Sequence, residues 1–97
     1  MKTKTEHRME KGLHKIAERI CWNFGDNFGY AFQGGPLTMF VYDFSKLLFH
    51  EQEILKIRLW QDKYQIFKRQ ATGDYKPLGS TTEADKLYSF IKKACNV

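Results

Sequence analysis

The chain has 97 residues, of which 42% are hydrophobic and 15% aromatic, so it can bury one core and is not expected to be disordered. Sixteen Lys and Arg against eleven Asp and Glu give a formal charge of +5, which favours anionic partners but also suits any small soluble domain. No stretch of about 18 apolar residues occurs, and the N-terminus carries no signal-like apolar run, so neither membrane spanning nor secretion is indicated. We expect a single cytoplasmic domain over residues 1–97.

The N-terminal segment combines a charged arm with an amphipathic pattern. Residues 1–6 are polar and charged, and we expect them to form a flexible basic arm. From Met9 to Phe24 apolar residues recur at steps of three and four, which predicts a helix over about residues 5–23. Gly25 follows as a left-handed cap.

Two runs with a two-residue period flank Gly34-Gly35, a pair that readily adopts the positive φ angles of a tight hairpin loop. Pairing Gln33 with Pro36 across this loop puts Phe32 opposite Leu37. The apolar side chains then share one face of the hairpin: Phe28, Tyr30, Phe32, Leu37, Met39 and Val41.

The segment over residues 43–53 fits two structures. Asp43 or Ser45 could cap a short helix that carries Phe44, Leu47 and Leu48, and we prefer this interpretation. A strand through residues 47–51 also fits the pattern.

The clearest two-residue periodicity lies over residues 54–70 and predicts a second hairpin. With Asp62-Lys63 as its loop, Leu59 lies opposite Ile66 and Arg58 opposite Phe67. The inward side chains are then Leu55, Ile57, Leu59 and Ile66, with Lys68 as one misfit. The outward side chains are Lys56, Arg58, Trp60, Gln65, Phe67 and Arg69.

Residues 71–79 are rich in Gly and Pro and predict a loop that holds at most a short strand near Tyr75. Ser80 and Glu83 have the spacing of a capping box, which predicts that the C-terminal helix begins there. Lys92 and Lys93 suit the end of this helix, where cations are favoured. Its buried stripe should consist of Ala84, Leu87, Tyr88, Ile91, Ala94 and Cys95.

These elements predict an α+β fold, in which an antiparallel sheet of four to five strands carries the N- and C-terminal helices packed on one face. No motif for phosphate binding, zinc binding or nucleophilic catalysis occurs. His50 lies close to Glu51 in the sequence, but nothing indicates the mutual geometry that a catalytic pair needs. We therefore expect no enzyme activity, no metal site and no cofactor.

The outward face of the second hairpin carries the functional prediction. Cations beside aromatic rings are the combination with which proteins hold the phosphates and bases of single strands. We expect the protein to bind nucleic acid through this face and the N-terminal arm, with the contacts made by Lys56, Arg58, Trp60, Phe67, Arg69, Lys2, Lys4 and Arg8.

A rival interpretation is a protein-binding adaptor or inhibitor that acts as a monomer or a homodimer. Exposed Trp, Phe and Arg are typical anchors of protein interfaces, so the same outward face fits this class as well. The sequence alone does not separate a nucleic-acid partner from a protein partner.

Overall fold

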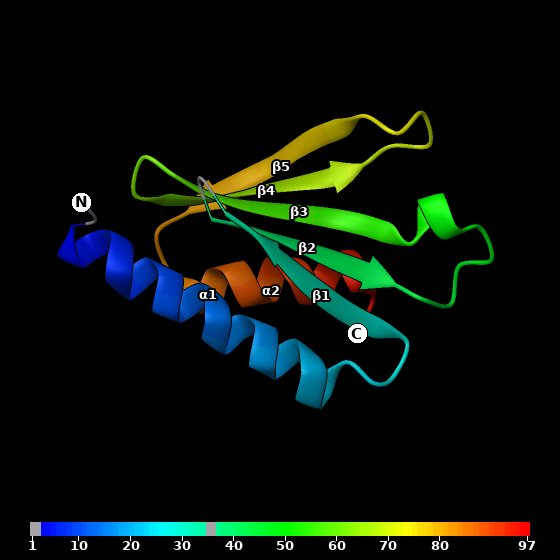
Figure 1. The fold of residues 1–97 in the computed structure, drawn as a ribbon, viewed down its shortest axis with the longest axis horizontal. Coiled ribbons are helices and arrows are strands. Elements are labelled where there is room, and N and C mark those ends of the chain that lie inside the picture. Colours follow the sequence, from blue (N-terminus) through cyan, green and yellow to red (C-terminus); the bar gives the residue numbers. More distant parts are fainter. Residues whose placement is uncertain (1–2, 35–36) are drawn as a thin grey trace.

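The computed structural model describes residues 3–34 and 37–97 and shows an antiparallel sheet with strand order β1-β2-β3-β4-β5. Both helices lie on one side of this sheet (Figure 1), so the predicted α+β architecture is confirmed. The elements in chain order are α1 (Lys4–Asn23), β1 (Phe28–Gln33), β2 (Thr38–Asp43), the short 3-10 helix η1 (Phe49–Glu51), β3 (Glu53–Trp60), β4 (Lys63–Arg69), β5 (Tyr75–Thr81) and α2 (Ala84–Cys95).

Helix α1 begins earlier than expected because Thr3 caps it. The Thr3 hydroxyl accepts a hydrogen bond from the Glu6 amide at 3.1 Å, which satisfies a free amide of the first turn. Residues 4–6 therefore belong to the helix and not to a flexible arm, while Lys2 lies outside the described residues. Gly25 has a φ of 88°, as predicted for the residue that follows the helix.

The first hairpin has the predicted faces but a different register. Gln33 pairs with Thr38 and Phe32 with Met39, so the expected pairing of Phe32 with Leu37 is wrong. The expected partner of Gln33, Pro36, lies outside the described residues. Because the register shifts by two positions, the side chains of the paired residues 28–33 and 38–43 keep their predicted faces.

The second hairpin shows the same kind of shift. Trp60 pairs with Lys63 and Leu59 with Tyr64, so the loop is Gln61-Asp62 and not Asp62-Lys63. Gln61 and Asp62 have φ angles of 52° and 58°, and a two-residue loop of type I′ requires positive values at both positions. The residues predicted to point inward and outward keep their faces, and Tyr64 joins the inward set.

The connection from β2 to β3 is neither the preferred helix nor the alternative strand. It consists of turns and bends that lead into η1, and it is closed by a hydrogen bond of 2.7 Å from the Asp43 amide to the Gln52 carbonyl. The Asp43 carboxylate accepts hydrogen bonds from the amide and hydroxyl of Ser45, so it supports a turn instead of a helix.

Strand β5 is longer than predicted, and it displaces the start of α2. Ser80 pairs with Gln65 and Thr81 with Tyr64, so the expected capping box at Ser80 is wrong. Helix α2 starts at Ala84 with Glu83 as its N-cap and no side-chain cap. Its buried stripe is as expected, and Lys92 and Lys93 lie in its last turn.

The core lies between the helices and the inward face of the sheet. Its buried apolar residues are Met9, Leu13, Ile16, Ala17, Ile20, Phe24, Met39, Val41, Leu55, Ile57, Leu59, Tyr64, Ile66, Leu87, Tyr88 and Ile91. Tyr64 is an addition to the predicted set, and its hydroxyl donates a hydrogen bond of 2.7 Å to the Met9 carbonyl. Gly12 makes room for this contact, because a Cβ atom there would lie 2.5 Å from the hydroxyl oxygen.

We predict that Gly12→Ala destabilises the fold by about 1 to 3 kcal/mol, since the added methyl group must push Tyr64 off its hydrogen bond. In a Tyr64→Phe background the same substitution should instead stabilise by up to about 1 kcal/mol, because only the better helix propensity of Ala remains. Denaturant unfolding of the parent, the two single variants and the double variant measures the effect of Gly12→Ala on the unfolding free energy in each background. The same sign in both backgrounds would show that the hydroxyl does not constrain α1.

Candidate nucleic-acid interface

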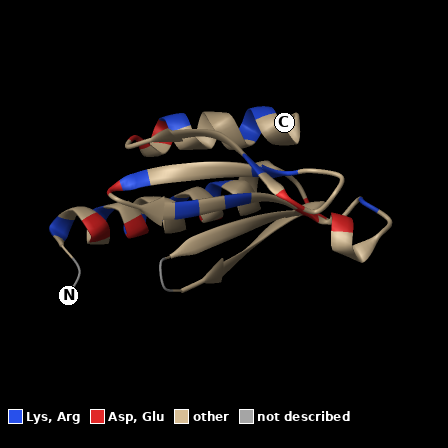
Figure 2. Cartoon of the chain, turned by 90° about the horizontal axis from the view of Figure 1, so that it is seen from above, with Lys and Arg blue, Asp and Glu red and all other residues tan. Residues whose placement is uncertain are grey.

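No helix of the described chain covers the sheet face opposite α1 and α2 (Figure 1). We call this surface the outer face. It includes Phe40, Tyr42, Glu53, Lys56, Arg58, Trp60, Lys63, Gln65, Phe67, Arg69 and Tyr75. The strand pairings thus bring five of the predicted site residues, Lys56, Arg58, Trp60, Phe67 and Arg69, to one surface. Figure 2 shows basic positions along the strands of the sheet.

Two cations of the outer face, Lys56 and Arg58, lie over aromatic rings. The Arg58 guanidinium carbon is 5.2 Å from the centre of the Trp60 ring and 5.6 Å from that of Phe67. The Lys56 ammonium is 5.6 Å from the Phe67 ring and equally far from the Tyr75 ring. Arg58 also donates two hydrogen bonds to the Gln65 side chain, at 3.1 and 2.7 Å. These contacts hold the positive charges and the rings in one alternating array.

The strands place one carboxylate, Glu53, on the described part of this face, and it does not neutralise the cations. It accepts a hydrogen bond from the Tyr42 hydroxyl at 3.4 Å and a short one from the Tyr75 hydroxyl. Among the described residues, neither Lys56, Arg58 nor Arg69 forms an ion pair. The outer face is therefore positive, and no described carboxylate forms an ion pair with these three cations.

The two tyrosines beside Glu53 have raised pKa values. Burial raises the pKa of Tyr42, and the adjacent Glu53 charge and hydrogen bond raise it further. Burial likewise raises the pKa of Tyr75, as do the hydrogen bond from its hydroxyl to Glu53 and the Glu53 charge, against a smaller opposing effect of Arg69. Both hydroxyls stay protonated at neutral pH and act as donors to Glu53.

At the end nearest η1 the outer face deepens into a hollow of about 600 Å³. Its walls include the stacked rings of Tyr42 and Phe44, whose centres are 5.9 Å apart and whose planes differ by 3°. Phe49, Glu53 and Arg69 also line it. Sequence reasoning did not place Tyr42 or Phe44 in the site. The alternation of β2 indicates the direction of Tyr42, but no pattern predicts the turn that brings Phe44 there.

Lys4 and Arg8 do not share the outer face. Both are exposed positions of α1, which packs against the opposite face of the sheet. Their predicted cooperation with Lys56 and Arg58 is therefore not supported by the arrangement, and Lys2 lies outside the described residues.

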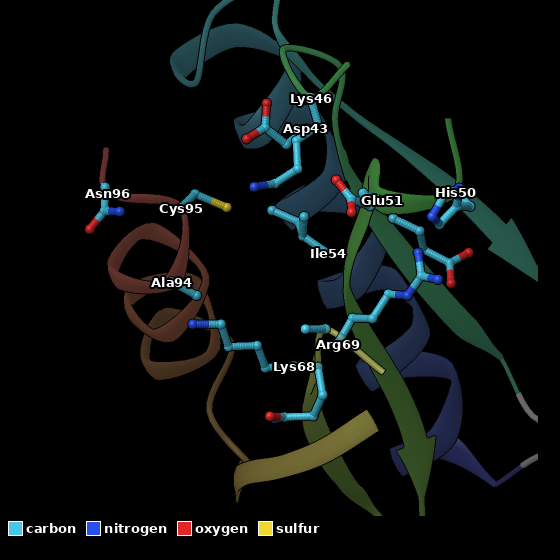
Figure 3. A pocket seen from close by; sticks show the side chains of 13 residues that line it. Asp43, Lys46, His50, Glu51, Ile54, Lys68, Arg69, Ala94, Cys95 and Asn96 are labelled. Atoms are coloured by element: carbon cyan, nitrogen blue, oxygen red, sulfur yellow. The ribbon is translucent and has the colours of Figure 1, made fainter. Parts of the chain in front are cut away.

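A second pocket of about 440 Å³ lies between the end of α2 and the connection that contains η1 (Figure 3). Its lining includes Asp43 together with His50 and Glu51, the two titratable neighbours considered in the sequence analysis. In the described chain no hydrogen bond joins His50 to either carboxylate, so no pair is oriented for proton transfer. Burial, with a contribution from Asp43, raises the pKa of the Cys95 thiol in this pocket to about 11, which makes it a poor nucleophile.

The described residues contain no group of three or more His, Cys, Asp or Glu that could hold a metal ion. Among them, no helix is both long and apolar enough to cross a membrane.

The connection between β2 and β3 also exposes a set of apolar side chains, three of which the sequence analysis assigned to a short helix without predicting their exposure. We call Phe44, Leu47, Leu48 and Phe49 the apolar loop. Leu47 is 99% exposed and Phe49 is 86% exposed. Clustered apolar residues on a surface are typical of contacts with other macromolecules.

The raised pKa values of Tyr42 and Tyr75 predict a loss of stability at alkaline pH. A proton that is held more tightly in the folded chain stabilises it fully below the unfolded tyrosine pKa of about 10 and no longer does so as pH rises through the folded pKa. A variant with Tyr42→Phe and Tyr75→Phe should therefore lose less unfolding free energy than the parent above about pH 10. Urea unfolding at a series of pH values gives the slope of unfolding free energy against pH for the parent and for the variant. Equal slopes for the two proteins would contradict the contacts of Tyr42 and Tyr75 with Glu53.

No protein-family model matches the chain, and neither a curated protein nor a solved structure matches it.

Proposed function

We propose that the protein is a non-catalytic module that binds single-stranded nucleic acid on the outer face. The observation that supports this most strongly is the alternation of Lys56, Arg58 and Arg69, none of which has an ion-pair partner in the described chain, with aromatic rings on an uncovered sheet. Such a surface offers charges for phosphates and rings for bases at the same time.

Each group has a role in this proposal. Lys56, Arg58 and Arg69 contact phosphate oxygens, while Trp60 and Phe67 stack against bases. The hollow beside Tyr42 extends the same surface. A duplex hides the faces of its bases, so the rings favour an unpaired strand. The contacts involve phosphates and base faces alone, and they therefore fit RNA and DNA equally.

Stacking requires a base to share or displace the cation that now covers a ring. A cation over an exposed ring contributes about 0.5 to 1 kcal/mol, whereas stacking of a base contributes about 1 to 3 kcal/mol. The exchange is therefore favourable for Lys56, whose long side chain can turn toward a phosphate as the base enters. When Arg58 turns, a phosphate must also replace the two hydrogen bonds that it donates to Gln65.

We further propose that the protein works in the cytoplasm and needs no cofactor. Cys21 and Cys95 are both free thiols, which suits a reducing compartment. The contacts assigned to the outer face involve side chains of this chain alone.

A protein-binding adaptor or inhibitor is the second candidate, and the apolar loop favours it. The almost complete exposure of Leu47 and Phe49 is costly for a surface without a partner, and such residues act as anchors in protein interfaces. The two candidates differ in the side chains that anchor the partner: Leu47 does not line the hollow, whereas Phe49 shares it with Arg69 of the charged array.

The proposal predicts the salt dependence of binding to a labelled single-stranded oligonucleotide. Each neutralised phosphate adds about 0.7 to the logarithmic salt slope. Changing Lys56, Arg58 and Arg69 to Gln should thus flatten the slope by about two units. Trp60→Ala should weaken binding by about 1 to 3 kcal/mol and keep the slope, because it removes stacking without removing charge.

A matched control changes Lys4, Arg8 and Lys11 of α1 to Gln, which removes the same charge from the other side of the sheet. This control should retain most of the parent slope. Equal slopes for the two triple variants would place the binding elsewhere. If the parent binds no oligonucleotide at about 50 mM salt, the nucleic-acid proposal is wrong and the protein-binding candidate replaces it.

A further inference from the structure

The two edges of the sheet are protected to different degrees. At the β5 edge, Pro77 has no amide hydrogen to offer, Lys76 adds a charge, and a bulge interrupts the pairing with β4 after Ile66. Prolines, lysines and bulges of this kind prevent an edge strand from pairing with another chain. The β5 edge is thus closed to further strands.

The β1 edge has none of these devices. Its sequence, FGYAFQ, contains no charge and no proline, and its pairing with β2 runs without a bulge. The strand order places β1 at one end of the sheet, and Figure 1 shows it beyond β2. Alternate residues of an edge strand direct their amide and carbonyl groups outward. The Phe28 amide bonds to the Gly25 carbonyl at 3.4 Å, and the outward backbone groups of Tyr30 and Phe32 lie along the rest of this uncharged strand.

We propose that β1 pairs with β1 of a second copy of this chain, antiparallel and across a two-fold axis. The inference does not depend on the proposed nucleic-acid binding. An edge strand that carries no charge can meet its own copy without burying a charged group, and a two-fold axis makes this contact closed and symmetric.

The pattern of β1 selects the register of this pair. Residues directly opposite each other in an antiparallel pair share a face, so the symmetric pair must match Phe28, Tyr30 and Phe32 with the same set in the second copy. Centring the axis on Tyr30 sets Tyr30 against its own copy and Phe28 against Phe32. The inward face then gains a continuous row of six rings, while Gly29 faces Ala31 on the other side.

The exposure of Tyr30 supports this pairing. Tyr30 belongs to the inward row through its pairing with Val41, which is fully buried, yet its own side chain is 40% exposed. The core residues of α1 therefore leave the outermost strand partly uncovered, and the rings of a second copy would complete its burial. In the dimer the two outer faces lie on the same side of one ten-stranded sheet.

Sedimentation over a concentration series tests the proposal, with a dimer of twice the 11.5 kDa chain mass as the expected result. Since each copy carries a net charge of +5, added salt should strengthen the dimer, which is the opposite of its effect on nucleic-acid binding. Tyr30→Lys should give monomers, because two like charges then lie directly opposite each other. Tyr30→Glu should do the same.

Mixing the Tyr30→Lys and Tyr30→Glu proteins should restore the dimer, as opposite charges then meet across the axis. The matched control is Leu78→Lys on β5, where the original residue is also 40% exposed, and it should leave the mass in solution unchanged.

Amide exchange in the parent provides a test without substitutions: protection of β1 should rise with protein concentration. A monomeric parent, a dimer that survives Tyr30→Lys, or a mixture that stays monomeric would each overturn the proposal.

Discussion

The contact between the Tyr64 hydroxyl and the Met9 carbonyl is the constraint on which the arrangement of the layers depends. It joins β4 to α1 inside the core at 2.7 Å, and it requires Gly12 because any larger residue would displace the hydroxyl. With α1 held over the inward face, α2 packs beside it, and the buried stripes of both helices are used on one side of the sheet. The opposite face is left without a covering helix in the described chain.

An uncovered sheet face must be stabilised by its own side chains, and here this requirement produces the candidate site. Lys56 and Arg58 lie over the rings of Phe67 and Trp60, while Glu53 is held by two tyrosine hydroxyls instead of by a cation. The side chains of this surface are thus held by contacts with one another, and the surface keeps a positive net charge. Stability and the proposed binding use the same residues, so a bound strand would take over contacts that the cations now make with the rings.

The faces of the strands could be predicted from the sequence, but their registers and the irregular segments could not. A shift of two positions keeps every side chain on its face, so alternation alone does not identify the loop residues of a hairpin. The spacing of a capping box occurs at Thr3 and again at Ser80, and only the first caps a helix, because Ser80 is paired within β5. The long-range pairing of β5 overrides the local signal at Ser80.

The site could be predicted as far as it lies on regular strands. The alternation of β3 and β4 places Lys56, Arg58 and Phe67 on one surface. The hollow beside Phe44 depends on turns that have no periodic pattern. Chemical-shift mapping with a short single-stranded oligonucleotide at low salt locates the surface to which the strand binds. We expect the amides of β3, β4 and β5 to shift together. Shifts confined to α1 or to the apolar loop would show that the outer face does not bind the strand.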